Sequence, residues 1–145
     1  MKSEPGTYVL LLYCRIRAEA EIGRLGNLVI KPGYYIYVGS AFGPGGLLAR
    51  VRRHYSNTKS KHWHIDYLLD FVKPVNVWYS YEPVKLEHEW ARILSGMKHM
   101  ISVKGFGCSD CSCNSHLFRS KVKPDFECFS AEAGGNVHLY RSPNH

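Results

Sequence analysis

The sequence lacks any long hydrophobic run, since its longest apolar stretch covers only seven residues, 8–14. A membrane-spanning helix needs about 20, so we expect neither a transmembrane segment nor a membrane partner. Residues 1–5 contain no apolar stretch of the kind that a signal peptide carries, which favours a cytoplasmic, reducing location. Internal repeats and low-complexity tracts are also absent. With 145 residues, 45% of them apolar and 21% charged, the composition indicates one folded domain and excludes disorder for most of the chain.

Acidic residues are missing from one stretch of the chain, between Leu47 and His64. That stretch carries five Lys and Arg residues, while the net charge of the whole chain is +7. Such a local concentration of positive charge favours a polyanion as partner, and nucleic acid above all. The alternative is a solvated helix face. The candidate nucleic-acid-binding residues in or next to this stretch are Arg52, Arg53, Lys59, Lys61, His62 and His64.

Cysteine is scarce, with five residues in all, an odd number that does not indicate a disulfide framework. Three of them form a cluster that ends near a histidine: Cys108, Cys111, Cys113 and His116. A structural zinc site would lack the second ligand pair of a usual zinc module. Zinc, a disulfide and free thiols in a packed loop therefore all remain open.

The hydrophobic pattern predicts an α+β fold with a small central antiparallel or mixed sheet flanked by helices. We expect strands at residues 6–14, 27–30, 34–39 and 75–81, and helices at 46–55, 62–72 and 86–97. The first three strands are expected to pair as an antiparallel meander, with a loop at 15–23. Shorter edge strands are expected at 101–104 and 116–118, and 137–140 offers a further one.

The predicted helix at 46–55 combines a core face with a basic edge. Its core face comprises Leu47, Leu48, Val51 and Tyr55. Arg50 and His54 are four residues apart and lie beside that face, where a helix edge meets a sheet and a cleft would form. Arg52 and Arg53 are expected to point further outward.

Several short motifs occur in an order that resembles a known family. The residues are GTYVLLL at 6–12, GYYIYVGSA at 33–41, GLLARVRRHY at 46–55, KHWHIDYLL at 61–69 and GFGCSDCSCNSHLF at 105–118. Together they resemble the GIY-YIG nuclease superfamily and, within it, the DUF123 group. The resemblance implies a family domain at residues 1–119, with 120–145 as a C-terminal extension packed on the same domain.

The resemblance implies a metal-dependent endonuclease that hydrolyses phosphodiester bonds, with DNA as the favoured substrate and RNA as the alternative, and with a function in repair. The catalytic residues would be Tyr8, Tyr37, Arg50, His54 and Glu87. Tyr8 would act as general base if a cation lowered its pKa, Tyr37 would orient the water or phosphate, and Arg50 would clamp the phosphate, with His54 assisting.

A divalent metal, Mg²⁺ or Mn²⁺, would be held by the carboxylate of Glu87, with Glu89 as the reserve ligand. Asn114 would match a polar residue of the site. Two other readings compete with the nuclease: a non-catalytic nucleic-acid-binding module on a nuclease-like fold, and a protein-interaction domain whose basic face is incidental. The sequence leaves the oligomeric state open.

Overall fold

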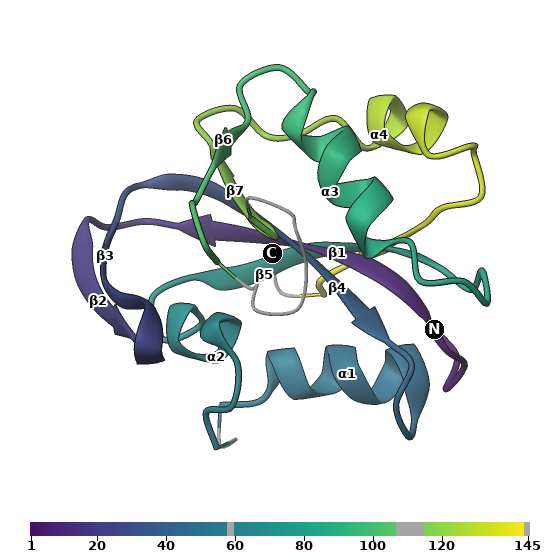
Figure 1. Ribbon diagram of the computed structural model, residues 1–145, viewed down its shortest axis with the longest axis horizontal. Helices are drawn as coiled ribbons and strands as arrows, with labels where there is room; N and C mark the ends of the chain where they lie inside the picture. The colour runs from purple at the N-terminus through teal and green to yellow at the C-terminus, as the bar shows by residue number, and fades with distance from the viewer. Residues whose placement is uncertain (58–59, 107–114, 144–145) are drawn as a thin grey trace.

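The computed structural model describes residues 1–57, 60–106 and 115–143. Its centre is a six-stranded antiparallel sheet with helices on both faces, in the strand order β6-β7-β4-β1-β5-β8 (Figure 1). This confirms the predicted α+β class. The strands of this sheet are β1 (Gly6–Cys14), β4 (Gly33–Ala41), β5 (Lys73–Ser80), β6 (Ile101–Ser102), β7 (Leu117–Ser120) and β8 (His138–Arg141).

The central strand β1 is paired on both sides, by β4 and by β5. Its run of Val, Leu and Tyr residues is buried almost throughout, as a strand covered by helices on both faces requires. Because successive side chains of a strand alternate between faces, Tyr8 and Leu10 join one core cluster while Val9 and Leu11 join the other.

Two pairs of helices cover the two faces of the sheet (Figure 1). One face carries α1 (Gly46–Tyr55) and α2 (His64–Leu68), and the other carries α3 (Glu87–Ser95) and α4 (Phe126–Glu132). The predicted bounds of α1 are confirmed. In the part of the chain that the structure describes, no helix has the length and apolar character needed to cross a membrane.

The predicted meander is wrong, because the segment between β1 and β4 forms its own sheet. β2 (Ala18–Ile22) pairs with β3 (Gly26–Ile30) through a 3₁₀ turn at Gly23–Leu25. The alternation of buried Ala20 and Ile22 with exposed glutamates is that of a strand buried on one face only. The exposed glutamates, Glu19 and Glu21, made this segment resemble a loop in the sequence. This hairpin packs on α2.

Two helices differ from the sequence pattern. α2 covers five residues and not the predicted 62–72, because after Leu68 the backbone tightens into turns, with the N–H of Asp70 bonded to Tyr67 and that of Phe71 to Leu68. α4 was not expected. Its start is marked by Asp125, whose side chain accepts a hydrogen bond from the backbone N–H of Glu127 at 3.0 Å. Phe129 of α4 is fully buried against Trp78 and Trp90.

Substituting Phe129 tests whether the C-terminal residues stabilise the same folded unit. Phe129→Ala should lower the free energy of unfolding by about 3–5 kcal/mol, the usual cost of removing a buried aromatic ring. Urea denaturation measures this, with Glu132→Ala on the same helix as an exposed control that should change stability by less than about 0.5 kcal/mol. Equal effects of the two substitutions would show that α4 contributes little to the stability of the sheet.

Candidate functional site

A buried tyrosine on the central strand forms the base of the site. The hydroxyl of Tyr8 lies 2.6 Å from Nε2 of His54, on α1, and both side chains are buried. The half-buried ring of Tyr37, on β4, packs beside them, with ring centroids 6.4 Å from Tyr8 and 6.2 Å from His54. Three predicted site residues from two strands and one helix are thus in mutual contact.

A glycine of β4 makes room for this cluster. Tyr8 is paired with Gly39 in the β1–β4 register, and its ring crosses over that residue. A Cβ atom at position 39 would lie 2.6 Å from the Tyr8 hydroxyl, a distance at which something must move. The glycine of the YVG sequence at 37–39 is therefore required for steric reasons, because any side chain at Gly39 would displace Tyr8 from His54.

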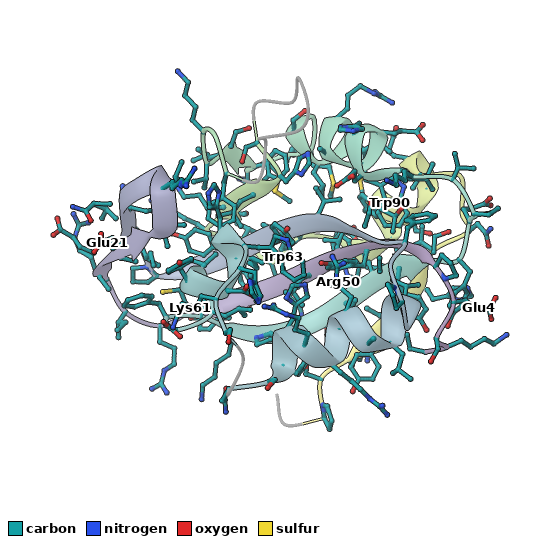
Figure 2. The ribbon with its side chains drawn as sticks, turned by 60° about the horizontal axis from the view of Figure 1, so that its bottom comes forward. Glu4, Glu21, Arg50, Lys61, Trp63 and Trp90 are labelled. Atoms are coloured by element: carbon teal, nitrogen blue, oxygen red, sulfur yellow. The ribbon has the colours of Figure 1, made fainter. Side chains whose placement is uncertain are left out.

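Arg50 is held at the edge of the cluster by two contacts. Its Nη1 donates to the backbone carbonyl of Ser40 at 2.9 Å, and its guanidinium lies 4.5 Å from the centre of the Trp63 ring (Figure 2). Stacking on an indole ring holds a guanidinium without using all of its N–H donors. The half-buried Arg50 therefore keeps donors for an anion.

Arg53 does not point outward as expected, since its guanidinium turns back onto a buried carboxylate. Its two terminal nitrogens donate to Asp66 at 2.6 and 3.0 Å, and it also lies 4.4 Å from the Trp63 ring centre. The same carboxylate accepts the backbone N–H groups of His62 and Trp63. Arg53 is thus engaged in joining α1 to the start of α2.

Burial alone would raise the pKa of Asp66, but these hydrogen bonds and the charge of Arg53 together hold it below its ordinary value. Asp66 and Trp63 are site residues that the sequence reasoning did not assign. The available signal was the acid of HWHID, which directly follows the acid-free basic stretch.

Glu87 approaches the cluster from the opposite helical layer, close enough for its charge to raise the pKa of Tyr8 and of Tyr37. It is the first residue of α3, next to Leu86, whose backbone N–H donates to the side chain of Thr7 on β1. Its half-buried carboxylate lies 3.8 Å from Nδ1 of His116. Burial lowers the pKa of His116 even though the charge of Glu87 opposes that shift. Glu89, the reserve ligand, is exposed.

The two phenols are electrostatically linked to Arg50 and Glu87. Burial raises the pKa of Tyr8 and of Tyr37 well above the ordinary value, and the charge of Glu87 adds to the rise, while Arg50 opposes it. The expected lowering of the Tyr8 pKa by a cation is therefore outweighed by burial. Both phenols are neutral at physiological pH, and Tyr8 can lose its proton only to a neighbouring acceptor.

The remaining predicted residues are spread around this centre. Arg52, Lys61 and His62 are exposed, and Lys61 forms an ion pair with Asp70 at 3.2 Å. His64 is half-buried, its ring 5.4 Å from that of Phe106, and burial lowers its pKa. Outside the described residues lie Lys59, Cys108, Cys111, Cys113 and Asn114.

The described residues contain no group of three His, Cys, Asp or Glu side chains that could hold a metal ion. His116, one of the four candidate zinc ligands, is buried beside Glu87, and its ring lies 5.8 Å from that of His88. Among the described residues, Asp66 is taken up by Arg53, so the site offers one carboxylate for a metal, from Glu87, and no complete cage.

Comparison with known proteins identifies a family. The family model described as "Domain of unknown function DUF123" matches residues 7–137, which include α1, α3, α4 and all of β1 except its first residue. No curated protein and no solved structure matches the chain.

The buried Asp66 carboxylate gives a testable pH dependence. Because its folded pKa is lowered, its stabilisation is fully present above the unfolded value of about 3.9 and is lost as the pH falls through the folded pKa. Asp66→Asn leaves the Arg53 guanidinium without its partner and should cost about 3–5 kcal/mol at neutral pH.

Urea denaturation at a series of pH values measures this cost, and the difference between wild type and Asp66→Asn should shrink below about pH 4. Asp70→Asn is the matched control, since the exposed pair with Lys61 is worth less than about 1 kcal/mol. A pH-independent difference for Asp66→Asn would contradict the assignment.

Proposed function

The chain belongs to the DUF123 family, and we propose that it is a metal-dependent endonuclease of the GIY-YIG type that hydrolyses phosphodiester bonds in DNA. The observation that carries the proposal is the buried hydrogen bond between Tyr8 and His54 beneath Tyr37 and Arg50. A binding surface has no need of a buried phenol aligned on an imidazole, whereas a proton-transfer site does.

The phenol and the imidazole form a proton relay. With Nε2 of His54 unprotonated, Tyr8 donates its hydrogen bond to that nitrogen. The phenol oxygen accepts a hydrogen bond from Arg50 and keeps its second lone pair to accept a proton from water. As the water attacks phosphorus, its proton passes to Tyr8 and the Tyr8 proton passes to His54. The raised pKa of Tyr8 makes this coupled transfer necessary, because a free phenolate is not available.

Arg50 supplies the phosphate contact. A guanidinium matches two phosphate oxygens with parallel N–H donors, and the Ser40 carbonyl and the Trp63 ring fix its plane. Tyr37, also neutral, donates a hydrogen bond from its hydroxyl group to the water or to a phosphate oxygen. Both contacts orient the phosphate toward the water beside Tyr8.

The donor set fits Mg²⁺ or Mn²⁺. Mg²⁺ keeps several waters and binds through one or two carboxylates together with substrate phosphates, so a single half-buried carboxylate suffices. Glu87 is that carboxylate, and Glu89 is exposed on the same helix. Glu87 would hold the ion, which would supply stabilisation of negative charge on the phosphate and on the leaving oxygen.

Removing the charge of Glu87 should stop cleavage but not binding. Glu87→Gln keeps the size of the side chain and loses the carboxylate that holds the cation, a contribution of several kcal/mol to the barrier. Cleavage of nicked, flapped, branched and single-stranded DNA with Mg²⁺ or Mn²⁺ is the measurement. The control is Glu89→Gln, two residues along α3, which should cleave normally. If Glu89→Gln is inactive and Glu87→Gln is active, the ligand assignment is wrong.

Removing the phenol oxygen should stop the relay. Tyr8→Phe retains the ring over Gly39 and loses the group that takes the proton of water, so the rate should fall by about a hundredfold or more. Affinity for DNA, measured by fluorescence anisotropy, should stay within about threefold, since Lys and Arg make the phosphate contacts. Tyr13→Phe, at the far end of the same strand, is the control. A Tyr8→Phe variant as active as wild type would refute the relay.

Binding and cleavage assays distinguish the nuclease from a non-catalytic nucleic-acid-binding module. If the wild-type protein binds DNA with a steep salt dependence and cuts no substrate with either metal, the fold serves binding alone. If affinity does not depend on salt, phosphate contacts are absent and the basic face is incidental.

A further inference from the structure

A large cavity lies beside α1, and Arg50 is not among the residues that line it. Its volume is about 930 Å³, within the usual range of about 300–1,000 Å³ for a small-molecule site. It is bounded by the α1 residues Leu48, Arg52 and Tyr55, by the segment that follows α2 and by the end of β8. His54 also lines it, so the cavity and the proposed relay share one side chain.

The cavity walls offer aromatic rings. Tyr55 and Tyr140 meet edge to face with centroids 6.4 Å apart, and the Tyr55 hydroxyl is hydrogen-bonded to Ser142. This bond and the ring contact hold Tyr55 in place on α1. Tyr140 is 37% exposed on the edge strand β8, so one side of its ring is accessible to a ligand. A planar aromatic group can therefore pack there.

The charge around the cavity is positive once its ion pairs are counted. Asp66 and Asp70 both line it, but the first is paired with Arg53 and the second with Lys61. Two further cations line it, Arg52 and Lys73, and both are exposed. Among the described residues neither has an ion pair. The cavity thus suits an aromatic group that carries negative charge.

We propose that this cavity holds one unpaired nucleotide of the substrate, its base against Tyr55 and Tyr140 and its phosphate on Arg52 and Lys73. The inference rests on the proposed nuclease function for the identity of the ligand. A base within a duplex enters a cavity of this kind only at the cost of unpairing and unstacking, a cost that an unpaired base avoids. The preferred substrate therefore carries a single-stranded segment next to the bond that is cut.

The test compares two DNAs in EDTA, so that no cleavage occurs: a blunt duplex, and the same duplex with a single-stranded overhang containing 2-aminopurine. The wild-type protein should bind the overhang DNA more tightly and quench the 2-aminopurine. Tyr140→Ala should weaken overhang binding about tenfold, the usual effect of losing one stacking ring. Tyr140→Phe, which keeps the ring, should bind like wild type, and blunt-duplex affinity should not change in either variant.

A charge variant tests the same cavity without touching its aromatic wall. Arg52→Ala should lower the salt slope of overhang binding by about one. The matched control is Arg92→Ala, an equally exposed arginine on α3 at the other face of the sheet, which should leave the slope unchanged. Should Tyr140→Ala fail to fold, Arg52→Ala and the quenching of 2-aminopurine by the wild-type protein still decide.

Equal wild-type affinity for the two DNAs, or unchanged overhang binding in both Tyr140→Ala and Arg52→Ala, would overturn the proposal. The experiments distinguish failure of the proposed nucleotide site from failure of the proposed nuclease activity. A protein that cuts blunt duplex with no preference for overhangs is a nuclease without this site. A protein that cuts nothing, yet loses its overhang preference in Tyr140→Ala, has the site without the activity.

Discussion

The buried carboxylate of Asp66 is the group on which the arrangement of the basic segment depends. It accepts two hydrogen bonds from Arg53 and one each from the backbone of His62 and Trp63, so it fastens α1 to the start of α2. Trp63 is thereby fixed beside the Arg50 guanidinium. A buried charge without its partner is costly, so any packing of α1 and α2 that separated Arg53 from Asp66 would be strongly destabilised.

The same carboxylate also reduces the net positive charge of the basic segment in the folded protein. Counted along the sequence, the stretch from Leu47 to His64 is uniformly basic. In the fold, two acids that follow this stretch in the sequence form ion pairs with it: Asp66 with Arg53 and Asp70 with Lys61. Among the described cations of this stretch, the two without an ion pair lie on α1, Arg50 beside the phenols and Arg52 beside the large cavity.

The catalytic cluster that we propose draws on both layers of helices. Tyr8, Tyr37 and His54 lie on the face covered by α1, whereas Glu87 begins α3 on the other face. The first residues of β1 bring them together, since Thr7 binds the start of α3 while Tyr8 points to α1. The alternation of side chains along one strand thus connects the relay to the carboxylate.

The sequence by itself determined the elements with strong local patterns. The apolar run of β1 and the amphipathic α1 were predictable, and with them the α+β class and the presence of Arg50 and His54 on one helix edge. Local patterns also misled: the segment of β2 resembled a loop because two of its five residues are glutamates, and the seven-residue α4 was too short to show a period.

Only the tertiary structure decided the electrostatics and the contacts between distant residues. That Tyr8 bonds to His54, 46 residues away, depends on the β1–β4 register and on the absence of a side chain at Gly39. The raised pKa of the phenols, the capture of Arg53 by Asp66 and the meeting of Glu87 with His116 follow from burial and distance. Burial and distance cannot be read from the order of the residues, because both arise only when the sheet and its two helical layers assemble.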